Sequence, residues 1–127
     1  MPDSHLFEYA VIRIVPKVER EEFINVGVIL YCSAQKFLQA RFDVNTDKVR
    51  ALCKKTDLDE LQGYIHSFER ICQGGAAGGP IGKLPIAERF RWLTATRSTV
   101  LQTSKVHPGL CESAEEMLNH LFTQLVL

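Results

Sequence analysis

The sequence has no excess of either charge and no long apolar run. Lys and Arg together number 15, as do Asp and Glu, so the formal net charge at pH 7 is zero. A neutral chain has no overall field that would attract nucleic acid or an anionic membrane. No window approaches the roughly 20 apolar residues of a membrane helix, and no signal peptide is visible at the start. We therefore expect no membrane contact and a cytoplasmic location.

Closely spaced cysteine pairs are also absent. The four cysteines stand far apart, at Cys32, Cys53, Cys72 and Cys111. Structural zinc is normally held by ligand pairs about two to four residues apart, and disulfide frameworks belong to small secreted scaffolds. The sequence therefore predicts free thiols, no structural metal and no cofactor.

The composition is that of an ordinary folded domain. Apolar residues make up 46% of the 127 residues and charged residues 24%, which argues against disorder. A chain of this length fits one domain, residues 1–127. Charge is nevertheless placed unevenly, because residues 83–107 carry five basic residues against one acidic residue, Glu88.

The first third of the chain has the pattern of β-strands. Runs rich in Val, Ile, Tyr and Phe lie at residues 7–15, 23–32 and 36–43. Short connections between them indicate an antiparallel meander. Asn25 and Gly27 interrupt the second run, and both residue types are depleted from strand interiors. Two explanations stay open: a bulge, or a small polar pocket bounded by Asn25, Glu22 and an arginine.

The pattern then changes to the helical period. Apolar residues recur every three or four positions between Leu58 and Cys72, which predicts an amphipathic helix. Pro85 suits the first position of a further short helix, and Ser113 with Glu116 forms a capping box before a final helix. We expect that final helix to pack on the sheet.

The expected organisation is one α+β domain. Residues 7–43 are expected to be rich in strands, residues 46–73 to be helical and residues 74–84 to form a flexible glycine-rich loop. Residues 85–127 are expected to form a helix, a strand and a second helix, with the fourth strand at 98–103 and a turn at 106–109. These elements predict an antiparallel β-sheet of about four strands that is packed on one side by helices.

The basic segment around the single tryptophan is a candidate ligand site. Guanidinium groups bind carboxylate or phosphate in a fork, and an aromatic neighbour can stack a base. Arg89, Arg91 and Arg97 would hold the anion beside Trp92. The alternative is that the aromatic residues belong to the core and that the arginines pair with the acidic residues at 19–22.

Catalytic patterns are weak in this sequence. A nucleophilic site would use Ser98 or a cysteine with His107, but nothing in the sequence brings them together, and a catalytic base needs a third group to align it. The glycine-rich stretch is not a phosphate loop, because Ala77 and Leu84 stand where that loop needs Gly and Ser or Thr.

Two blocks of sequence resemble a bacterial family catalogued as domain of unknown function 3037 (DUF3037). They are residues 9–16 with 20–30, and residues 89–98 with 104–109. The first block matches the family pattern Arg-x-Glu-x-x-Asn-x-Gly at Arg20, Glu22, Asn25 and Gly27. The resemblance favours five positions as site candidates: Arg20, Glu22, Asn25, Arg89 and Arg97. Members that resemble this chain are often encoded beside HipA-like kinases, which implies a regulatory or toxin–antitoxin setting.

Two functions stand as predictions. The first is a small non-enzymatic module that binds a protein partner, such as a HipA-like kinase. The second is a protein or enzyme that binds a phosphate-containing ligand, a nucleotide or nucleic acid. The candidate ligand residues are Arg20, Glu22, Asn25, Arg89, Arg91, Arg97, Ser98 and His107. The sequence also allows a homo-oligomer.

Overall fold

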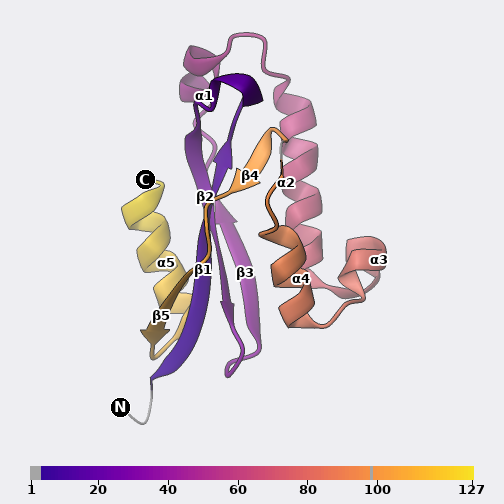
Figure 1. The fold of residues 1–127 in the computed structure, drawn as a ribbon, viewed down its shortest axis with the longest axis vertical. Helices are drawn as coiled ribbons and strands as arrows, with labels where there is room; N and C mark the ends of the chain where they lie inside the picture. Colours follow the sequence, from indigo (N-terminus) through magenta and orange to yellow (C-terminus); the bar gives the residue numbers. More distant parts are fainter. Residues whose placement is uncertain (1–3, 98) are drawn as a thin grey trace.

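The structure is a computed structural model that describes residues 4–97 and 99–127. An antiparallel sheet runs through the middle of the molecule, between helices on its two faces (Figure 1). The elements in chain order are β1 (His5–Ile14), η1 (Val18–Arg20), β2 (Ile24–Cys32), β3 (Phe37–Phe42), α1 (Thr46–Leu52), α2 (Leu58–Gln73), η2 (Gly75–Gly78), α3 (Gly79–Gly82), α4 (Ile86–Leu93), β4 (Leu101–Thr103), β5 (His107–Cys111) and α5 (Ala114–Leu125).

The sheet is built around β1. Its strand order is β3–β2–β1–β4, and β5 pairs with the same edge of β1 as β4 does. β1 is ten residues long, so residues 5–9 can pair with β5 while residues 12–14 pair with β4. The predicted α+β class and antiparallel sheet are confirmed, with five strands rather than about four. The extra strand is β5, where a turn was expected; its Pro108 is tolerated because an edge strand has one unpaired side.

β2 contains a bulge at Val26. Ile12 pairs with Gly27 and Arg13 pairs with Asn25, so Val26 has no partner on β1. One extra residue changes which face the following side chains point to. Val26 therefore packs in the core cluster under α2, whereas Val28 two positions later lies in the cluster under α5. Of the two explanations that the sequence left open, the bulge is present.

The sheet is covered by helices on both faces, not on one face as the sequence predicted. α2 and α4 pack on one face, where Phe68 and Phe90 are buried, and α5 packs on the opposite face through Leu118. β2 explains why helices cover both faces. Ile29 points into the core cluster under α2 and α4, and its neighbour Leu30 points into the cluster under α5. A strand that is apolar on both faces needs a layer on each side.

The helix starts follow local signals in the sequence. Asp57 accepts a hydrogen bond from the Glu60 N–H at 3.0 Å, and Ser113 accepts one from the Glu116 N–H at 3.3 Å. These side chains satisfy N–H groups that have no partner in the first turn of a helix. The glycine-rich segment, expected to be a flexible loop, forms η2 and the short helix α3 beside the end of α2. Across the described residues, the helices fall short of the length and apolarity that a membrane span requires.

Candidate functional site

Two cavities adjoin one another along α2. The first, of about 570 Å³, lies between the β1–β2 connection, the α1–α2 connection and the start of α2. The second, of about 270 Å³, lies between α2, α4 and β4. Tyr64 lines both cavities. We call the two together the α2–β4 trough: its basic end contains Lys17 and Lys55, and its aromatic end contains Trp92 and Arg97.

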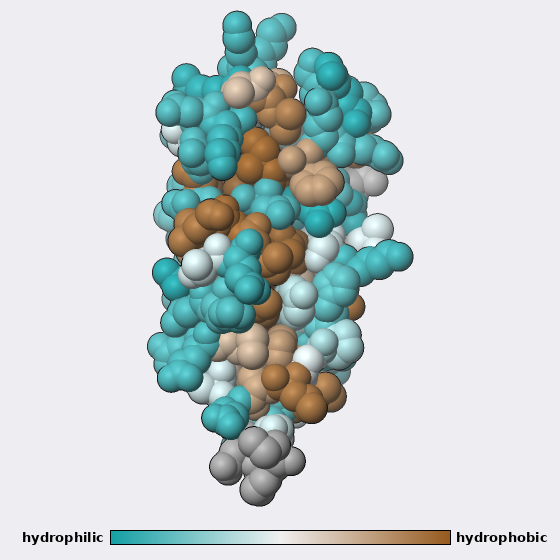
Figure 2. Space-filling model, turned by 90° about the vertical axis from the view of Figure 1, so that its left-hand side faces the viewer, coloured by the Kyte–Doolittle hydropathy of each residue, from teal (hydrophilic) through white to brown (hydrophobic). Residues whose placement is uncertain are grey.

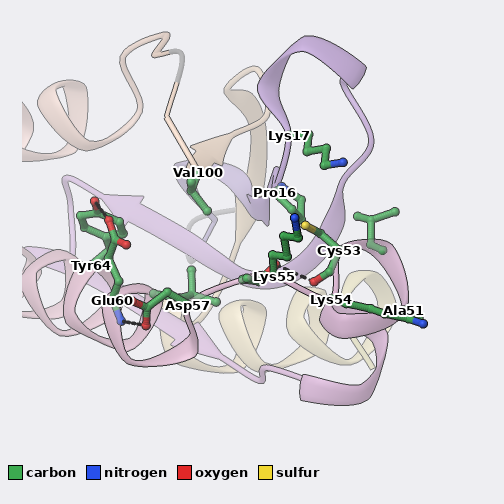
Figure 3. A pocket seen from close by; sticks show the side chains of 13 residues that line it. Pro16, Lys17, Ala51, Cys53, Lys54, Lys55, Asp57, Glu60, Tyr64 and Val100 are labelled. Carbon is green, nitrogen blue, oxygen red and sulfur yellow. Dashed lines mark hydrogen bonds between the residues drawn. The ribbon is translucent and has the colours of Figure 1, made fainter.

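The basic end carries lysine side chains from two connections. Lys17 follows β1, Lys55 lies in the turn before α2, and Pro16 and Val100 add apolar surface (Figure 3). Ion pairs in the described part of the chain join Arg20 to Glu22 and Arg91 to Glu8, so neither Lys17 nor Lys55 has a carboxylate within 4.0 Å. Both ammonium groups are therefore available to an anion.

Two carboxylates line the same cavity nearer to Tyr64. Asp57 caps the start of α2, and Glu60 accepts a hydrogen bond of 2.6 Å from the Tyr64 hydroxyl. That hydrogen bond and the charge of Glu60 raise the pKa of Tyr64. The two acidic groups already have partners at the start of α2. Lys17 and Lys55 have no charged partner in the part of the chain that the structure describes.

The Cys53 thiol lies beside Lys55 in the basic end (Figure 3). A hydrogen bond from the Lys55 backbone, a hydrogen bond from Thr56 and the charges of the two lysines lower the pKa of Cys53, although burial acts in the opposite direction. In contrast, burial raises the pKa of Cys72 to about 12 and also raises the pKa of Cys111. Cys53 is therefore more easily ionised than either of these two thiols.

The aromatic end pairs an arginine with the tryptophan. The guanidinium carbon of Arg97 lies 4.0 Å from the centre of the Trp92 ring, and its Nη2 donates to the Trp92 carbonyl oxygen. Burial lowers the pKa of Arg97. Phe68 and Leu93 supply apolar lining. Arg97 therefore forms the combination of arginine and tryptophan that the sequence suggested, whereas Arg91 lies 5.4 Å from the centre of the Phe90 ring.

The other two arginines of that segment have different partners. Arg89 donates to the carbonyl oxygens of Ile71 and Cys72, at 2.9 and 2.7 Å, and of Leu84 at 3.1 Å. Arg91 makes two hydrogen bonds to the Glu8 carboxylate, at 2.8 and 3.1 Å. The arginines therefore do not converge on one anion site.

Arg89 does not belong to the polar group predicted around Asn25 and Glu22. Glu22 pairs with Arg20 at 2.5 Å, next to the start of β2. Arg89 lines a different cavity beside the first residues of β3, which pair with the last residues of β2. The nine residues of β2 span roughly 30 Å at 3.3 Å per residue. Glu22 and Arg89 therefore lie at opposite ends of the sheet.

Asn25 contacts the end of α5 instead. Its Nδ2 donates to the Leu125 carbonyl oxygen at 3.2 Å. Asn25 Oδ1 and Arg13 Nε, on paired residues of β2 and β1, are buried and have no hydrogen-bond partner among the described residues. The Arg13 guanidinium lies 4.0 Å from the centre of the Phe23 ring, and burial lowers the pKa of Arg13. Asn25 thus joins α5 to the bulged part of the sheet.

Of the two remaining candidates, the structure describes His107, whereas Ser98 lies outside the described residues. The His107 ring packs on Tyr9, with 5.3 Å between ring centres. Within residues 4–97 and 99–127, no three His, Cys, Asp or Glu side chains are grouped so that they could hold a metal ion.

Sequence reasoning missed Lys17, Lys55 and Tyr64. The two lysines belong to connections that are far apart in the chain and meet only when the β1–β2 connection packs near the start of α2. Tyr64 lies on the exposed side of α2, 45% exposed, and a single surface tyrosine is too common to give a signal.

A family model matches residues 9–126. The chain belongs to the family described as protein of unknown function (DUF3037). The DUF3037 region runs from β1 to the end of α5, so it includes every residue that lines the trough. No curated protein and no solved structure matches the chain.

Proposed function

We propose that this protein binds a small phosphate-containing ligand at the basic end of the α2–β4 trough. The observation that carries the proposal is a preformed cavity of about 570 Å³ bordered by Lys17 and Lys55, neither of which has a carboxylate partner among residues 4–97 and 99–127. Lysine binds phosphate as a compact point charge with three donors. The carboxylates of the same cavity are held by the α2 backbone and by Tyr64.

The expected affinity for inorganic phosphate alone is weak. A hydrogen bond to a charged group contributes about 1.5–3 kcal/mol, so two lysines give about 3–6 kcal/mol before the entropic cost of association. A millimolar dissociation constant corresponds to a net 4.1 kcal/mol, so the entropic cost makes the binding of phosphate alone weaker than millimolar. A physiological ligand would therefore need further contacts outside the two lysines.

The test is a thermal-shift and calorimetric titration with phosphate, pyrophosphate, tripolyphosphate and sulfate. An anion at a hundred times its dissociation constant stabilises the fold by about 2.7 kcal/mol. We expect binding by wild type and by Lys48→Ala, whose lysine is exposed on α1 outside the trough. The double variant Lys17→Ala/Lys55→Ala should lose binding. Wild type that binds none of these anions would overturn the proposal.

A second candidate function is a protein-binding regulatory module, with a HipA-like kinase as the partner. The observation in its favour is an exposed cross-strand pair on β1 and β5, in which Leu6 is 62% and Leu110 67% exposed. Exposed apolar surface of this kind is typical of interaction sites. Figure 2 shows apolar surface low on the α5 side of the molecule, near the N-terminus.

Co-expression with such a kinase tests this second function. The kinase should co-purify with wild type and not with Leu6→Ser/Leu110→Ser. Size-exclusion chromatography of the protein alone separates this result from self-association, because a homo-oligomer through the same pair would also dissociate in the double variant. Equal recovery of the kinase with both proteins would contradict a role for this surface.

A further inference from the structure

We propose that the ligand of the α2–β4 trough is a nucleotide, with its base at the aromatic end and its phosphate groups at Lys17 and Lys55. This inference rests on the proposed function, because it uses the same two lysines. It goes further in naming the ligand class and in assigning a role to the second cavity.

The two cavities are the two ends of one elongated site. Along α2, the basic end is lined by Asp57, Glu60, Leu61 and Tyr64, and the aromatic end by Tyr64, Ser67, Phe68 and Ile71. The two sets are displaced by about seven residues, which is two helical turns or roughly 10 Å at 1.5 Å per residue. On the opposite wall Val100 lines the basic end and Leu101 the aromatic end. An extended molecule lying beside α2 would contact both ends.

The chemical order of the side chains along the trough matches the order of groups in a nucleotide. Aromatic rings and Arg97 come first, the carboxylates of Glu60 and Asp57 follow, and the lysines come last. Figure 3 shows the latter part of this order, from Tyr64 through Glu60 and Asp57 to Lys55. An aromatic surface binds a base, hydrogen-bond acceptors bind the hydroxyls of a ribose, and cations bind phosphate groups, in the same order along the ligand.

The aromatic end suits a planar base. Tyr64 and Trp92 lie on its border and are 45% and 41% exposed, so their rings are open to stacking. Arg97 is held against Trp92 by the ring contact and by one bond to a carbonyl oxygen. A guanidinium group has five N–H donors, and those that remain can reach acceptors on the edge of a base, as arginine does with guanine in DNA.

The middle and the basic end suit a ribose and its phosphates. Glu60 uses one carboxylate oxygen for Tyr64 and keeps further acceptor sites for a sugar hydroxyl. Lys17 and Lys55 then meet the phosphates. Lys54 also lines this cavity, with its side chain directed away from Cys53 (Figure 3). A free nucleotide fits better than a polynucleotide, because the formal net charge of zero gives no field to hold a phosphate backbone.

The experiment compares nucleotides with tripolyphosphate by isothermal titration calorimetry at one salt concentration. ATP, GTP, CTP and UTP are titrated into wild type and Trp92→Ala. We expect at least one of them to bind wild type about tenfold more tightly than tripolyphosphate does. Trp92→Ala should bind that nucleotide no more tightly than it binds tripolyphosphate. The affinity for tripolyphosphate should be the same in Trp92→Ala as in wild type. The double variant Lys17→Ala/Lys55→Ala should lose both.

Phe23→Ala is the matched control for Trp92→Ala. Phe23 is also an exposed aromatic residue, and the Arg13 guanidinium lies 4.0 Å from its ring centre, the same distance as in the pair of Arg97 and Trp92. Phe23 does not line the trough. Phe23→Ala should keep the nucleotide affinity of wild type. Thermal melts of each variant establish that it is folded before titration.

The outcomes separate the nucleotide assignment from phosphate binding. Nucleotides that bind wild type no more tightly than tripolyphosphate would overturn the nucleotide assignment and leave phosphate binding in place. Equal effects of Trp92→Ala and Phe23→Ala on nucleotide affinity would also overturn the nucleotide assignment alone. Wild type that binds neither tripolyphosphate nor any nucleotide would overturn both proposals.

Discussion

The guanidinium group of Arg89 lies against the backbone carbonyl of Cys72, with 2.7 Å from Nη1 to the oxygen. The same nitrogen reaches the Ile71 carbonyl oxygen at 2.9 Å. Both carbonyls belong to the last turn of α2, where no following N–H of the helix is available to them. A positive charge at this position also complements the helix dipole. An arginine that the sequence suggested as an anion ligand is therefore a cap of α2.

We predict that Arg89→Met destabilises the protein by about 3 kcal/mol. Hydrogen bonds to a charged group contribute about 1.5–3 kcal/mol each, and the methionine keeps only the apolar stem. Arg91→Met is the control, because Arg91 pairs with Glu8 at the surface, where an ion pair contributes about 0–1 kcal/mol. Urea unfolding of both variants and wild type gives the comparison. Equal losses from the two substitutions would contradict the capping role.

A second prediction concerns two glycines in contrasting surroundings. A Cβ atom added at Gly27 would lie 2.6 Å from the Arg41 carbonyl oxygen and 2.9 Å from Cδ1 of Phe42, whereas one added at Gly63 meets nothing within 4 Å. Gly27→Ala should therefore destabilise by about 1–3 kcal/mol, as overpacking does, because a paired strand cannot move aside. Gly63→Ala should stabilise by about 0.8–1 kcal/mol, since Gly63 is exposed inside a helix.

Chemical denaturation measures both glycine variants. The sign of the change is the decisive result, because the same substitution should lower the stability at Gly27 and raise it at Gly63. A Gly27→Ala variant as stable as wild type would mean that β3 does not approach β2 as closely at the bulge as the structure has it.

Much of the fold could be predicted because its signals are local. Asp57 and Ser113 are helix caps that can be recognised from a few neighbouring residues, and Asn25 with Gly27 marks the interruption that is a bulge at Val26. The strand β5 could not be predicted in this way. Its sequence contains Pro108 and Gly109, which locally favour a turn, and only the free edge of β1 makes a strand of it.

The candidate site depended on contacts that the sequence does not encode locally. Arg97 beside Trp92 was within reach of sequence reasoning, since the two are close in the chain. Lys17 and Lys55 were not, because they are neighbours only through the packing of the β1–β2 connection on the start of α2. Arg89 is held outside the trough for a related reason: the carbonyl oxygens at the end of α2 accept from its Nη1.

The last prediction concerns the reactivity of Cys53 towards iodoacetamide. The neighbouring N–H, hydroxyl and ammonium groups lower the pKa of Cys53 below the ordinary thiol value of 9.0, so a larger fraction is thiolate at neutral pH. Cys72, whose pKa is raised to about 12, and the buried Cys111 should react only after unfolding. Mass spectrometry of the native protein should find the first label on Cys53, at a rate that rises with pH and reaches half its maximum below pH 9.0.

Thr56→Val and tripolyphosphate should both slow this labelling. The valine removes the Thr56 hydroxyl, which donates to the Cys53 carbonyl oxygen at 2.9 Å and lowers the pKa of the neighbouring thiol. The pKa of Cys53 therefore rises and the half-maximum moves to higher pH. A phosphate bound at Lys17 and Lys55 also disfavours the thiolate, because it adds negative charge beside it. Cys53→Ser should abolish the first label. If Cys72 were labelled as fast as Cys53 in the folded protein, the prediction that Cys53 has the lower pKa would be contradicted.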